Sequence, residues 1–161
     1  MHPHEVIIER FYTAFAARDG AAMAASYHRD LVFQDPVFGV LTAEQTGAMW
    51  TMLCARAPDL KVTVSKVRAD DTSGSAAWDA WYTFSRSRRP VHNRISATFR
   101  FKDQRIIKHT DEFSFWRWSQ QALGITGWLL GWTPWLRRRV QREAHAGLVS
   151  YMQRQSPSGS V

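Results

Sequence analysis

The sequence of 161 residues has a single cysteine, few acidic residues and no long apolar run. Because Cys54 stands alone, the chain cannot form an internal disulfide or a cysteine-based zinc site. No uncharged apolar stretch reaches the roughly 18–20 residues that a membrane-spanning helix needs. The first residues also lack the apolar run behind a basic segment that is typical of a secretory signal. We therefore expect a soluble, cytoplasmic protein.

The residues that are present suffice for one packed core. Hydrophobic residues make up 45% of the chain and aromatic residues 13%, with eight tryptophans among them. The length is close to the usual size of one domain, so a second core is not expected. Charged residues make up 22%, an ordinary share for a folded protein, so we expect disorder only at the ends.

Basic residues outnumber acidic residues by 21 to 14, which gives a formal net charge of +7. The excess gathers in residues 86–108 and again in the cluster of Arg137, Arg138, Arg139 and Arg142. Such an excess attracts phosphates or anionic lipid. No zinc finger, RNA-binding signature or helix-turn-helix pattern accompanies it. We therefore expect solvated faces of strands and helices, and no nucleic acid partner.

The first part of the chain has the periodicity of helices. Apolar residues recur with helical spacing and predict a helix over residues 4–17, followed by a short one over residues 21–27. Residues 31–34 predict a short strand that stops at Asp35 and Pro36. Thr42 and Gln45 form a capping-box pattern, which predicts a third helix over residues 43–56.

The second part alternates between apolar and polar residues. This pattern predicts strands over residues 60–69, 76–85, 91–102 and 105–118. Apolar residues four apart, from Leu136 to Met152, then predict a helix over residues 136–155, and residues 156–161 are expected to form a disordered tail. Helices followed by long antiparallel strands indicate an α+β fold with helices on one face of a curved sheet.

Asp35 is the first candidate for chemistry. It ends an apolar strand and has Phe33, Pro36, Val37 and Phe38 around it, so we expect it to be partly desolvated. Desolvation raises the pKa of a carboxyl group and turns it into a potential general base. The alternative is that Asp35 only caps the turn at Pro36.

His109 and Asp111 are the second candidates. Alternation along the last predicted strand places both on the face that carries Ile107 and Phe113. Buried polar groups need partners, so these two either find them within the core or face a cavity. The pair offers no three-ligand set, so we expect neither a metal nor a cofactor.

Large aromatic side chains occupy the apolar positions of many elements. Most of them must belong to the core, but so many flat rings in a small domain are also suited to line a pocket for a small hydrophobic molecule. The residues expected to contact such a ligand are Phe11, Tyr12, Phe15, Phe33, Trp50, Trp78, Tyr82, Phe99 and Phe113.

The segments IERFYTAFAARD, LVFQDPVFG and RIIKHTDEF, in this order, resemble the nuclear transport factor two-like superfamily, which includes ketosteroid isomerases and SnoaL-like polyketide cyclases. The resemblance runs roughly from Glu5 to Phe115, and QDPVFG is its most specific piece. It implies a cone over residues 1–118, in which a curved antiparallel sheet wraps three helices around an apolar pocket. Residues 119–155 are then a helical extension packed on the same domain. Family members are frequently homodimers, so we expect a homodimer.

The resemblance also implies roles for single residues. Asp35 matches the general base of the isomerases, and Asp111 is similar to the acid/base carboxylate of the SnoaL-like branch, with His109 as its partner or as a donor. The isomerase oxyanion hole needs a tyrosine and a protonated aspartate, and Phe11 and Ala97 stand at these positions. Steroid isomerase activity is therefore not expected.

Together these features predict proton transfer, in an isomerisation or a cyclisation, on a small hydrophobic carbonyl compound. The alternative is a non-catalytic module that binds a small hydrophobic ligand or supports dimerisation.

The segment 122–136 carries no charge, contains Trp128, Trp132 and Trp135, and leads directly into three arginines. Tryptophan next to arginine is typical of a membrane-surface helix. Three glycines and Pro134, however, interrupt any long amphipathic helix. We expect the segment to pack over the pocket mouth or into a two-fold interface, with the arginines solvated. Contact with a membrane surface is the alternative.

Overall fold

The computed structural model describes residues 1–156, so the predicted tail lies outside the described residues except for Ser156. The elements follow in the order α1 (Pro3–Ala16), α2 (Gly20–Ala25), β1 (Tyr27–Asp35), β2 (Gly39–Thr42), α3 (Ala43–Arg56), β3 (Lys61–Ala69), β4 (Ser73–Thr83), β5 (Pro90–Lys102), β6 (Arg105–Glu112), α4 (Phe115–Leu123), α5 (Ile125–Leu130) and α6 (Pro134–Gln155).

Two of the N-terminal helices begin at capping boxes. At α1 the Glu5 carboxylate accepts the backbone N–H of His2 at 3.0 Å. At α3 Thr42 and Gln45 form the reciprocal pair that the sequence predicts, and the helix covers the predicted residues. These bonds satisfy backbone N–H groups that a helix start leaves without partners.

The strands form one sheet in the order β2-β1-β6-β5-β4-β3. The predicted α+β fold is confirmed, with one difference from a purely antiparallel sheet. Strands β3 to β6 form an antiparallel meander, and β6 then lies beside β1 and runs parallel to it. Strand β1 thereby joins the meander to β2, which is its other neighbour.

Strand β1 is longer than the sequence predicts. The predicted helix over residues 21–27 ends at Ala25, and β1 already begins at Tyr27, which pairs with Ile106 of β6. Local periodicity does not reveal a partner so far away in the sequence. A bulge in β6 also places Ile106, rather than Ile107, in the core, because two residues of β6 there oppose one of β5.

The predicted last strand ends early. Residues 115–118 begin α4 instead, because the Ser114 side chain accepts the backbone N–H of Arg117 and caps the helix. The helices that follow are short. Gly124, with a φ of +65°, ends α4, and Pro134 starts α6, so the predicted interruption of a long helix is confirmed.

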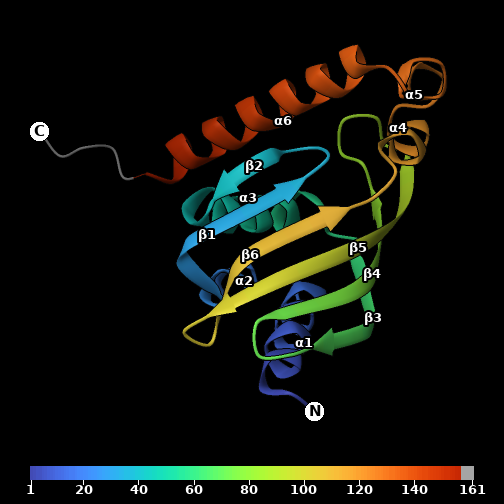
Figure 1. Ribbon diagram of the computed structural model, residues 1–161. Helices are drawn as coiled ribbons and strands as arrows, with labels where there is room; N and C mark the ends of the chain where they lie inside the picture. The colour runs from blue at the N-terminus through green and yellow to red at the C-terminus, as the bar shows by residue number, and fades with distance from the viewer. Residues whose placement is uncertain (157–161) are drawn as a thin grey trace, which may run out of the picture.

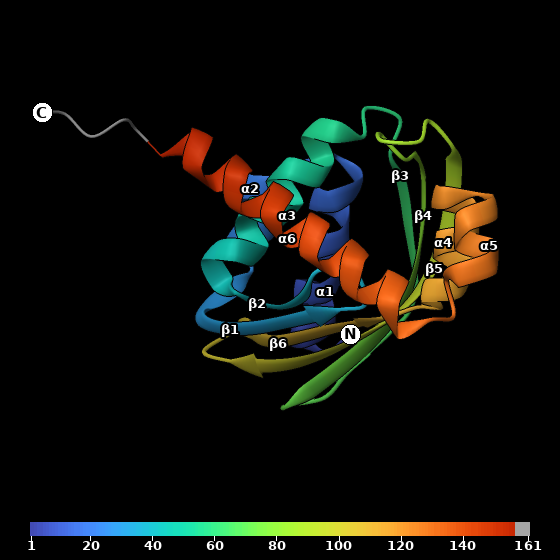
Figure 2. The ribbon, with the colours of Figure 1, turned by 90° about the horizontal axis from the view of Figure 1, so that it is seen from above.

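The sheet bends so that one of its faces is concave. Figure 2 shows α1, α2 and α3 in this hollow and α6 lying across its open side. In Figure 1, α4 and α5 lie beyond the end of the sheet, and α6 runs back from them over β1 and β2. The core fills the space between the helices and the concave face, with Ile8, Phe11, Phe33 and Met49 fully buried. This arrangement is the predicted cone.

The C-terminal helices differ from the prediction in one respect. The regular spacing from Leu136 to Met152 faces the cone, and Leu136 and Leu148 are buried. Trp128 and Trp132, however, are 60% and 73% exposed, so these two do not pack over the pocket mouth, whereas Trp135 and Leu136 line the cavity. The reason for the exposure is that α5 packs on α4 rather than on the cone, and its outer side chains point away from both. Packing of the segment into a two-fold interface stays a prediction. Within residues 1–156, no helix is long and apolar enough to span a membrane.

Candidate active site

A cavity of about 1000 Å³ lies between the sheet, α3 and the C-terminal helices. This volume is in the range of small-molecule binding sites. Most of the lining is apolar or aromatic, with few polar groups from the sheet. The side chains from the cone that line it include Phe15, Asp35, Trp50, Trp78, Ala80, Tyr82, Asn93, Ile95, Asp111 and Phe113.

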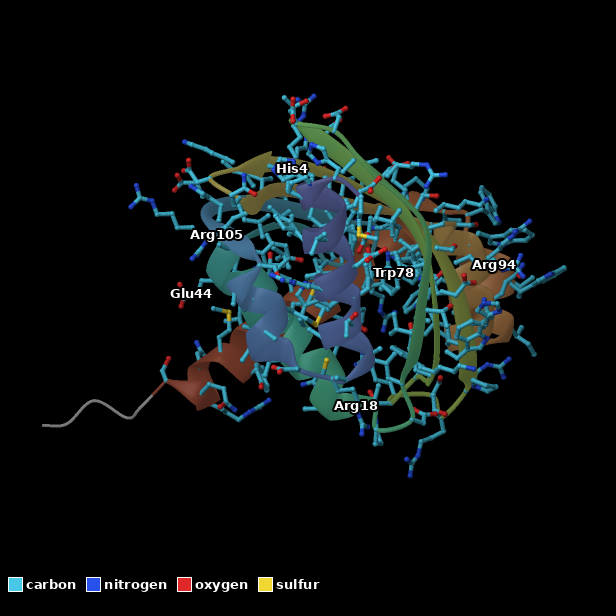
Figure 3. All side chains as sticks on the ribbon, turned by 90° about the horizontal axis from the view of Figure 1, so that it is seen from below. His4, Arg18, Glu44, Trp78, Arg94 and Arg105 are labelled. Carbon is cyan, nitrogen blue, oxygen red and sulfur yellow. The ribbon has the colours of Figure 1, made fainter. Side chains whose placement is uncertain are left out.

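Alternation along β4 decides which of its aromatic side chains face the cavity. Trp78 and Tyr82 line it, whereas Trp81 lies on the opposite face and stacks on His92 at a ring distance of 4.4 Å. Figure 3 shows Trp78 on the inner side of the sheet, toward α1, and Arg94 pointing away from the molecule. The sheet therefore has an aromatic inner face and a charged outer one.

Asp35 stands where β1 turns toward β2. Its Oδ1 atom accepts the backbone N–H groups of Val37 (2.8 Å) and Phe38 (2.5 Å), so it does cap the turn, and it also lines the cavity. Burial raises the pKa of the Asp35 carboxyl to about 7, since desolvation outweighs the backbone hydrogen bonds, and the negative charge of Asp111 adds to the rise. A carboxyl group with this pKa changes its charge near neutral pH.

Asp111 lies at the end of a buried chain of hydrogen bonds. Its Oδ1 atom is 3.0 Å from His109 Nε2 and accepts the indole N–H of Trp78 at 3.2 Å. The other ring nitrogen, His109 Nδ1, is 2.8 Å from the hydroxyl of Tyr27, which accepts the indole N–H of Trp50 at 2.9 Å. The chain thus connects α3, β1, β6 and β4.

Counting protons along this chain assigns the state of His109. The Tyr27 oxygen accepts a hydrogen bond from the Trp50 indole N–H, so the Tyr27 O–H donates to His109 Nδ1. His109 is then neutral with its proton on Nε2, and it donates that proton to Asp111. In any other arrangement the Tyr27 proton would be buried without an acceptor. His109 is fully buried and does not line the cavity, so its hydrogen bond positions Asp111 from the core side.

Tyr82 presents a hydroxyl group to the cavity. Its oxygen accepts the indole N–H of Trp118 at 2.9 Å, and within residues 1–156 no acceptor takes the Tyr82 proton. Burial raises the pKa of Tyr82 to about 12, and the charge of Asp35 adds to the rise. Tyr82 is therefore a hydrogen-bond donor in the same cavity as the Asp35 carboxyl group.

The structure divides the predicted site residues into two groups. Those that line the cavity are Asp35, Asp111, Phe15, Trp50, Trp78, Tyr82 and Phe113. Those that lie in the core and do not line it are His109, Phe11, Tyr12, Phe33 and Phe99. The rings of the second group contact each other within the core.

Two polar residues of this region, Tyr27 and Asn93, are not among the residues predicted from the sequence. Tyr27 was placed in a helix, so its role as partner of His109 was not visible. Asn93 lines the cavity, and alternation along β5 places it on the same face as Val91 and Ile95. His109 was selected because it is a polar residue on the apolar face of a strand. The same criterion identifies Asn93.

Charged side chains from three elements meet at the rim of the cavity. Glu143 of α6 accepts from Arg139 (3.2 Å) and from Arg86 (2.5 Å), which lies between β4 and β5. Arg56 of α3 also lines the cavity. Within the described part of the chain, no three His, Cys, Asp or Glu side chains are grouped so that they could hold a metal ion.

A curved sheet around three helices, with two carboxyl groups in an apolar cavity, defines a class of small α+β pocket proteins. Residues 8–109 match the SnoaL-like domain family, and the chain belongs to that family. The resemblance found in the sequence is thereby confirmed. The matched range ends at His109, so Asp111 and the C-terminal helices lie beyond it. Among curated proteins, none matches the sequence.

Solved structures with the same fold are similar along most of the chain. A hypothetical protein with a ketosteroid isomerase-like fold from Catenulispora acidiphila, in complex with trimethylamine, has a TM-score of 0.66 and 18% identity over 80% of this chain and 97% of its own. An LEH-like epoxide hydrolase from M. tuberculosis has a TM-score of 0.64 and 18% identity over 80% and 96%. IdmH from Streptomyces antibioticus, a candidate polyketide cyclase, has a TM-score of 0.62 and 21% identity over 77% and 100%. At these identities the likeness shows the fold alone.

Proposed function

We propose that this protein catalyses proton transfer at a carbon next to a carbonyl group in a small hydrophobic compound, with Asp35 as the general base and Tyr82 as the hydrogen-bond donor. One observation carries the proposal. A carboxyl group with a pKa of about 7 and a hydroxyl group with an unused proton share an apolar cavity. A base that titrates near neutral pH is suited both to take and to return a proton.

The chemistry needs no oxidant or reductant. The backbone N–H groups of Val37 and Phe38 both donate to Oδ1, so we assign the proton transfer to Oδ2. Asp35 takes a proton from the carbon, the C–H electron pair forms a carbon–carbon double bond, and the carbonyl electron pair moves to oxygen. Tyr82 donates a hydrogen bond to that oxygen, where the negative charge develops.

The enolate then has two outcomes. In an isomerisation, Asp35 returns the proton to a different carbon of the same molecule. In a cyclisation, the enolate carbon attacks a second carbonyl carbon, and the new alkoxide oxygen takes the proton from Asp35. A cavity of about 1000 Å³ with aromatic walls has room for a compound of two or more fused rings.

Asp111 and His109 have a supporting role in this proposal. The charge of Asp111 helps to raise the pKa of Asp35 into the useful range, and His109 positions Asp111 without reaching the cavity. Phe11 and Ala97 replace both donors of the isomerase oxyanion hole, and both are buried in the core. Tyr82 supplies a donor from a different element, β4.

The fold neighbours are consistent with a carbonyl-containing ring compound. One is the candidate polyketide cyclase IdmH, and another, TerC, was co-crystallised with polyporic acid. Because a shared fold does not establish a shared reaction, these neighbours enter the proposal by analogy only.

Exchange of carbon-bound hydrogen with deuterium tests the proposal without knowledge of the natural substrate. A panel of aromatic ketones, beginning with 2-tetralone, is incubated with the protein in D₂O, and loss of the proton signal next to the carbonyl is followed by NMR. We expect exchange above the buffer rate for ketones that bind. Asp35→Asn should abolish it, and Tyr82→Phe should slow it by about 10²–10³-fold.

The alternative is a binding module without turnover. In that case ketones that bind, as measured by tryptophan fluorescence, would exchange no faster than in buffer. A small molecule retained by the purified protein, identified by native mass spectrometry, would define the ligand in either case. The homodimer and the cytoplasmic location stay predictions.

A further inference from the structure

We propose that the surface formed by α5 and the adjoining parts of α4 and α6 docks on an anionic membrane surface. We call it the tryptophan surface, and it consists of Trp116, Ile125, Trp128, Leu129, Trp132 and Trp135. The proposal does not depend on the proposed function, because neither Asp35 nor Asp111 belongs to this surface.

The first argument is the amount of apolar surface exposed in one place. Trp132 is 73% exposed, Trp128 60% and Trp135 54%, and all three lie within two consecutive helices and their connection. Trp116 of α4 joins them, since its indole N–H donates to the carbonyl oxygen of Trp128 at 3.2 Å. A cluster of this kind is rare on a protein that has no partner for it.

The polar edges of two of these indoles are already satisfied. The indole N–H of Trp132 donates to the carbonyl oxygen of Leu129 at 2.9 Å, in the same way as that of Trp116 does to Trp128. The rings therefore present carbon to the outside and can enter an apolar medium without leaving an N–H group unpaired.

The close packing of α5 on α4 determines which side chains of α5 are exposed. A Cβ atom on Gly127 would lie 1.9 Å from the carbonyl oxygen of Ser119, and one on Gly131 would lie 2.0 Å from the Ser119 hydroxyl oxygen. Only glycine allows α5 to approach α4 so closely. This contact fixes the side of α5 that faces α4, and Trp128 and Leu129 then point outward.

The second argument is charge. Residues 113–142 contain five arginines, Arg117, Arg137, Arg138, Arg139 and Arg142, and no aspartate or glutamate. Within residues 1–156, Arg139 is the one of the five that forms an ion pair, with Glu143. All five are exposed, and the Arg139 guanidinium lies 5.6 Å from the centre of the Trp135 ring. Indoles and aliphatic side chains flanked by arginines match the acyl chains and the anionic headgroups at a bilayer surface.

A membrane fits this surface better than a nucleic acid does. Tryptophan and arginine also bind single strands by stacking and by contact with phosphates. Ile125 is 78% exposed, however, and Leu129 accompanies it. Aliphatic side chains have no stacking role toward bases, whereas they insert readily between lipid chains.

The surface also adjoins the cavity. Trp135 belongs to the tryptophan surface and also lines the cavity, as does the exposed Leu130, which follows Leu129 of that surface. On a docked chain, a compound dissolved in the bilayer would reach the cavity without crossing water. If the proposed function holds, its substrate is therefore a poorly water-soluble compound.

Vesicle binding tests the proposal. The full chain is mixed with vesicles of phosphatidylcholine that contain one quarter phosphatidylglycerol, and with vesicles of phosphatidylcholine alone, and the bound fraction is measured by flotation. We expect binding to the anionic vesicles that weakens at high salt. Arg137→Gln with Arg138→Gln should weaken it about 25-fold, since each arginine contributes about fivefold.

Insertion of the indoles is measured separately. Lipid brominated on its acyl chains should quench tryptophan fluorescence in the wild type, and Trp128→Gln with Trp132→Gln should lose most of both the quenching and the binding. The matched control is Val40→Gln with Arg94→Gln, which removes an exposed apolar side chain and an exposed arginine elsewhere and should bind like the wild type. Thermal melts verify that each variant is folded.

Three results would overturn the proposal. The first is no binding to anionic vesicles at low salt. The second is a dimer in sedimentation equilibrium that Trp128→Gln with Trp132→Gln dissociates while vesicles stay unbound, which would make the surface a subunit interface. The third is binding to oligothymidylate in place of vesicles. Ketone exchange by the control variant, measured in the absence of lipid, tests the proposed function independently.

Discussion

Asp35 and Asp111 occupy adjacent positions on the parallel strands β1 and β6, each two residues beyond the paired Phe33 and His109. Because side chains alternate between the faces of a sheet, all four residues belong to the concave face. The two carboxyl groups share one cavity, and the charge of Asp111 helps to raise the pKa of Asp35. The pairing of β1 with β6 therefore creates the candidate site.

The first prediction concerns the titration of Asp35. Carboxyl-carbon NMR of the wild type should show a group that titrates at a pKa of about 7 and disappears in Asp35→Asn. Asp111→Asn keeps an oxygen for Trp78 and His109 but removes the charge, so the pKa of Asp35 should fall. An unchanged Asp35 titration in Asp111→Asn would show that the two carboxyl groups do not interact.

The second prediction is a gain of stability in Asp35→Asn. The pKa of Asp35 is about 7 in the folded protein and near 4 when unfolded, so the unfolded chain binds fewer protons between these values. The free energy of unfolding of the wild type therefore falls as the pH rises from about 4 to about 7 through this group. The Asn variant avoids this loss.

Asp35→Asn should consequently be more stable than the wild type by roughly 2–4 kcal/mol above pH 7, with no gain near pH 4. Urea unfolding at a series of pH values measures the difference. A gain that does not depend on pH, or a loss at neutral pH, would contradict a raised pKa for Asp35.

The third prediction compares two buried tyrosines. Tyr27→Phe leaves His109 Nδ1 and the Trp50 indole N–H without a partner, which should cost about 2–5 kcal/mol. The Tyr12 hydroxyl is the one fully buried side-chain polar atom of residues 1–156 that has no hydrogen-bond partner. Tyr12→Phe should therefore stabilise the protein by about 1 kcal/mol, since it removes an unsatisfied group.

Both variants remove the same oxygen atom from a buried ring, so each is the control for the other. Thermal melts should separate them by roughly 5–20 °C in a protein of this size. Equal losses in the two variants would mean that the hydrogen-bond chain from Trp50 to Asp111 contributes nothing specific.

The fourth prediction tests the packing of α5 on α4. Gly127→Ala places a methyl group against the Ser119 backbone and should cost about 1–3 kcal/mol. Gly147→Ala, in the middle of α6, meets nothing closer than the Arg56 side chain at 3.9 Å and should add about 0.5–1 kcal/mol through helix propensity. Unfolding in urea gives both values. A neutral Gly127→Ala would remove the close contact between α4 and α5 on which the position of the tryptophan surface rests.

Sequence patterns located most of the elements because their signals are local. The capping box at Thr42, the four-residue period of α6 and the alternation along β5 depend on residues next to one another in the chain. The start of β1 and the end of β6 were misplaced for the opposite reason. Tyr27 becomes a strand residue through a distant partner on β6, and Ser114 ends the strand by capping a helix.

In the candidate site, too, some features follow from local sequence signals and others depend on distant partners. Alternation alone was enough to place His109 and Asp111 on the inner face of their strand, and the turn at Pro36 placed Asp35 at a strand end. The sequence did not show that Tyr27 would hold His109 or that Trp118 would leave the Tyr82 proton free, because these contacts join different elements. Asn93 is different, because its place on the apolar face of β5 can be read from the alternation along that strand.

By itself, the sequence of this protein determined the fold family, the order of most elements and the face on which His109 and Asp111 lie. These properties follow from periodicity, capping and turn residues, which act over a few neighbouring positions. Only the tertiary structure decided which candidates reach the cavity, which tyrosine hydroxyl is available there as a hydrogen-bond donor, and that Trp128 and Trp132 face outward. Those outcomes depend on burial and on contacts between distant elements. Burial and these contacts form only when the sheet folds around the helices.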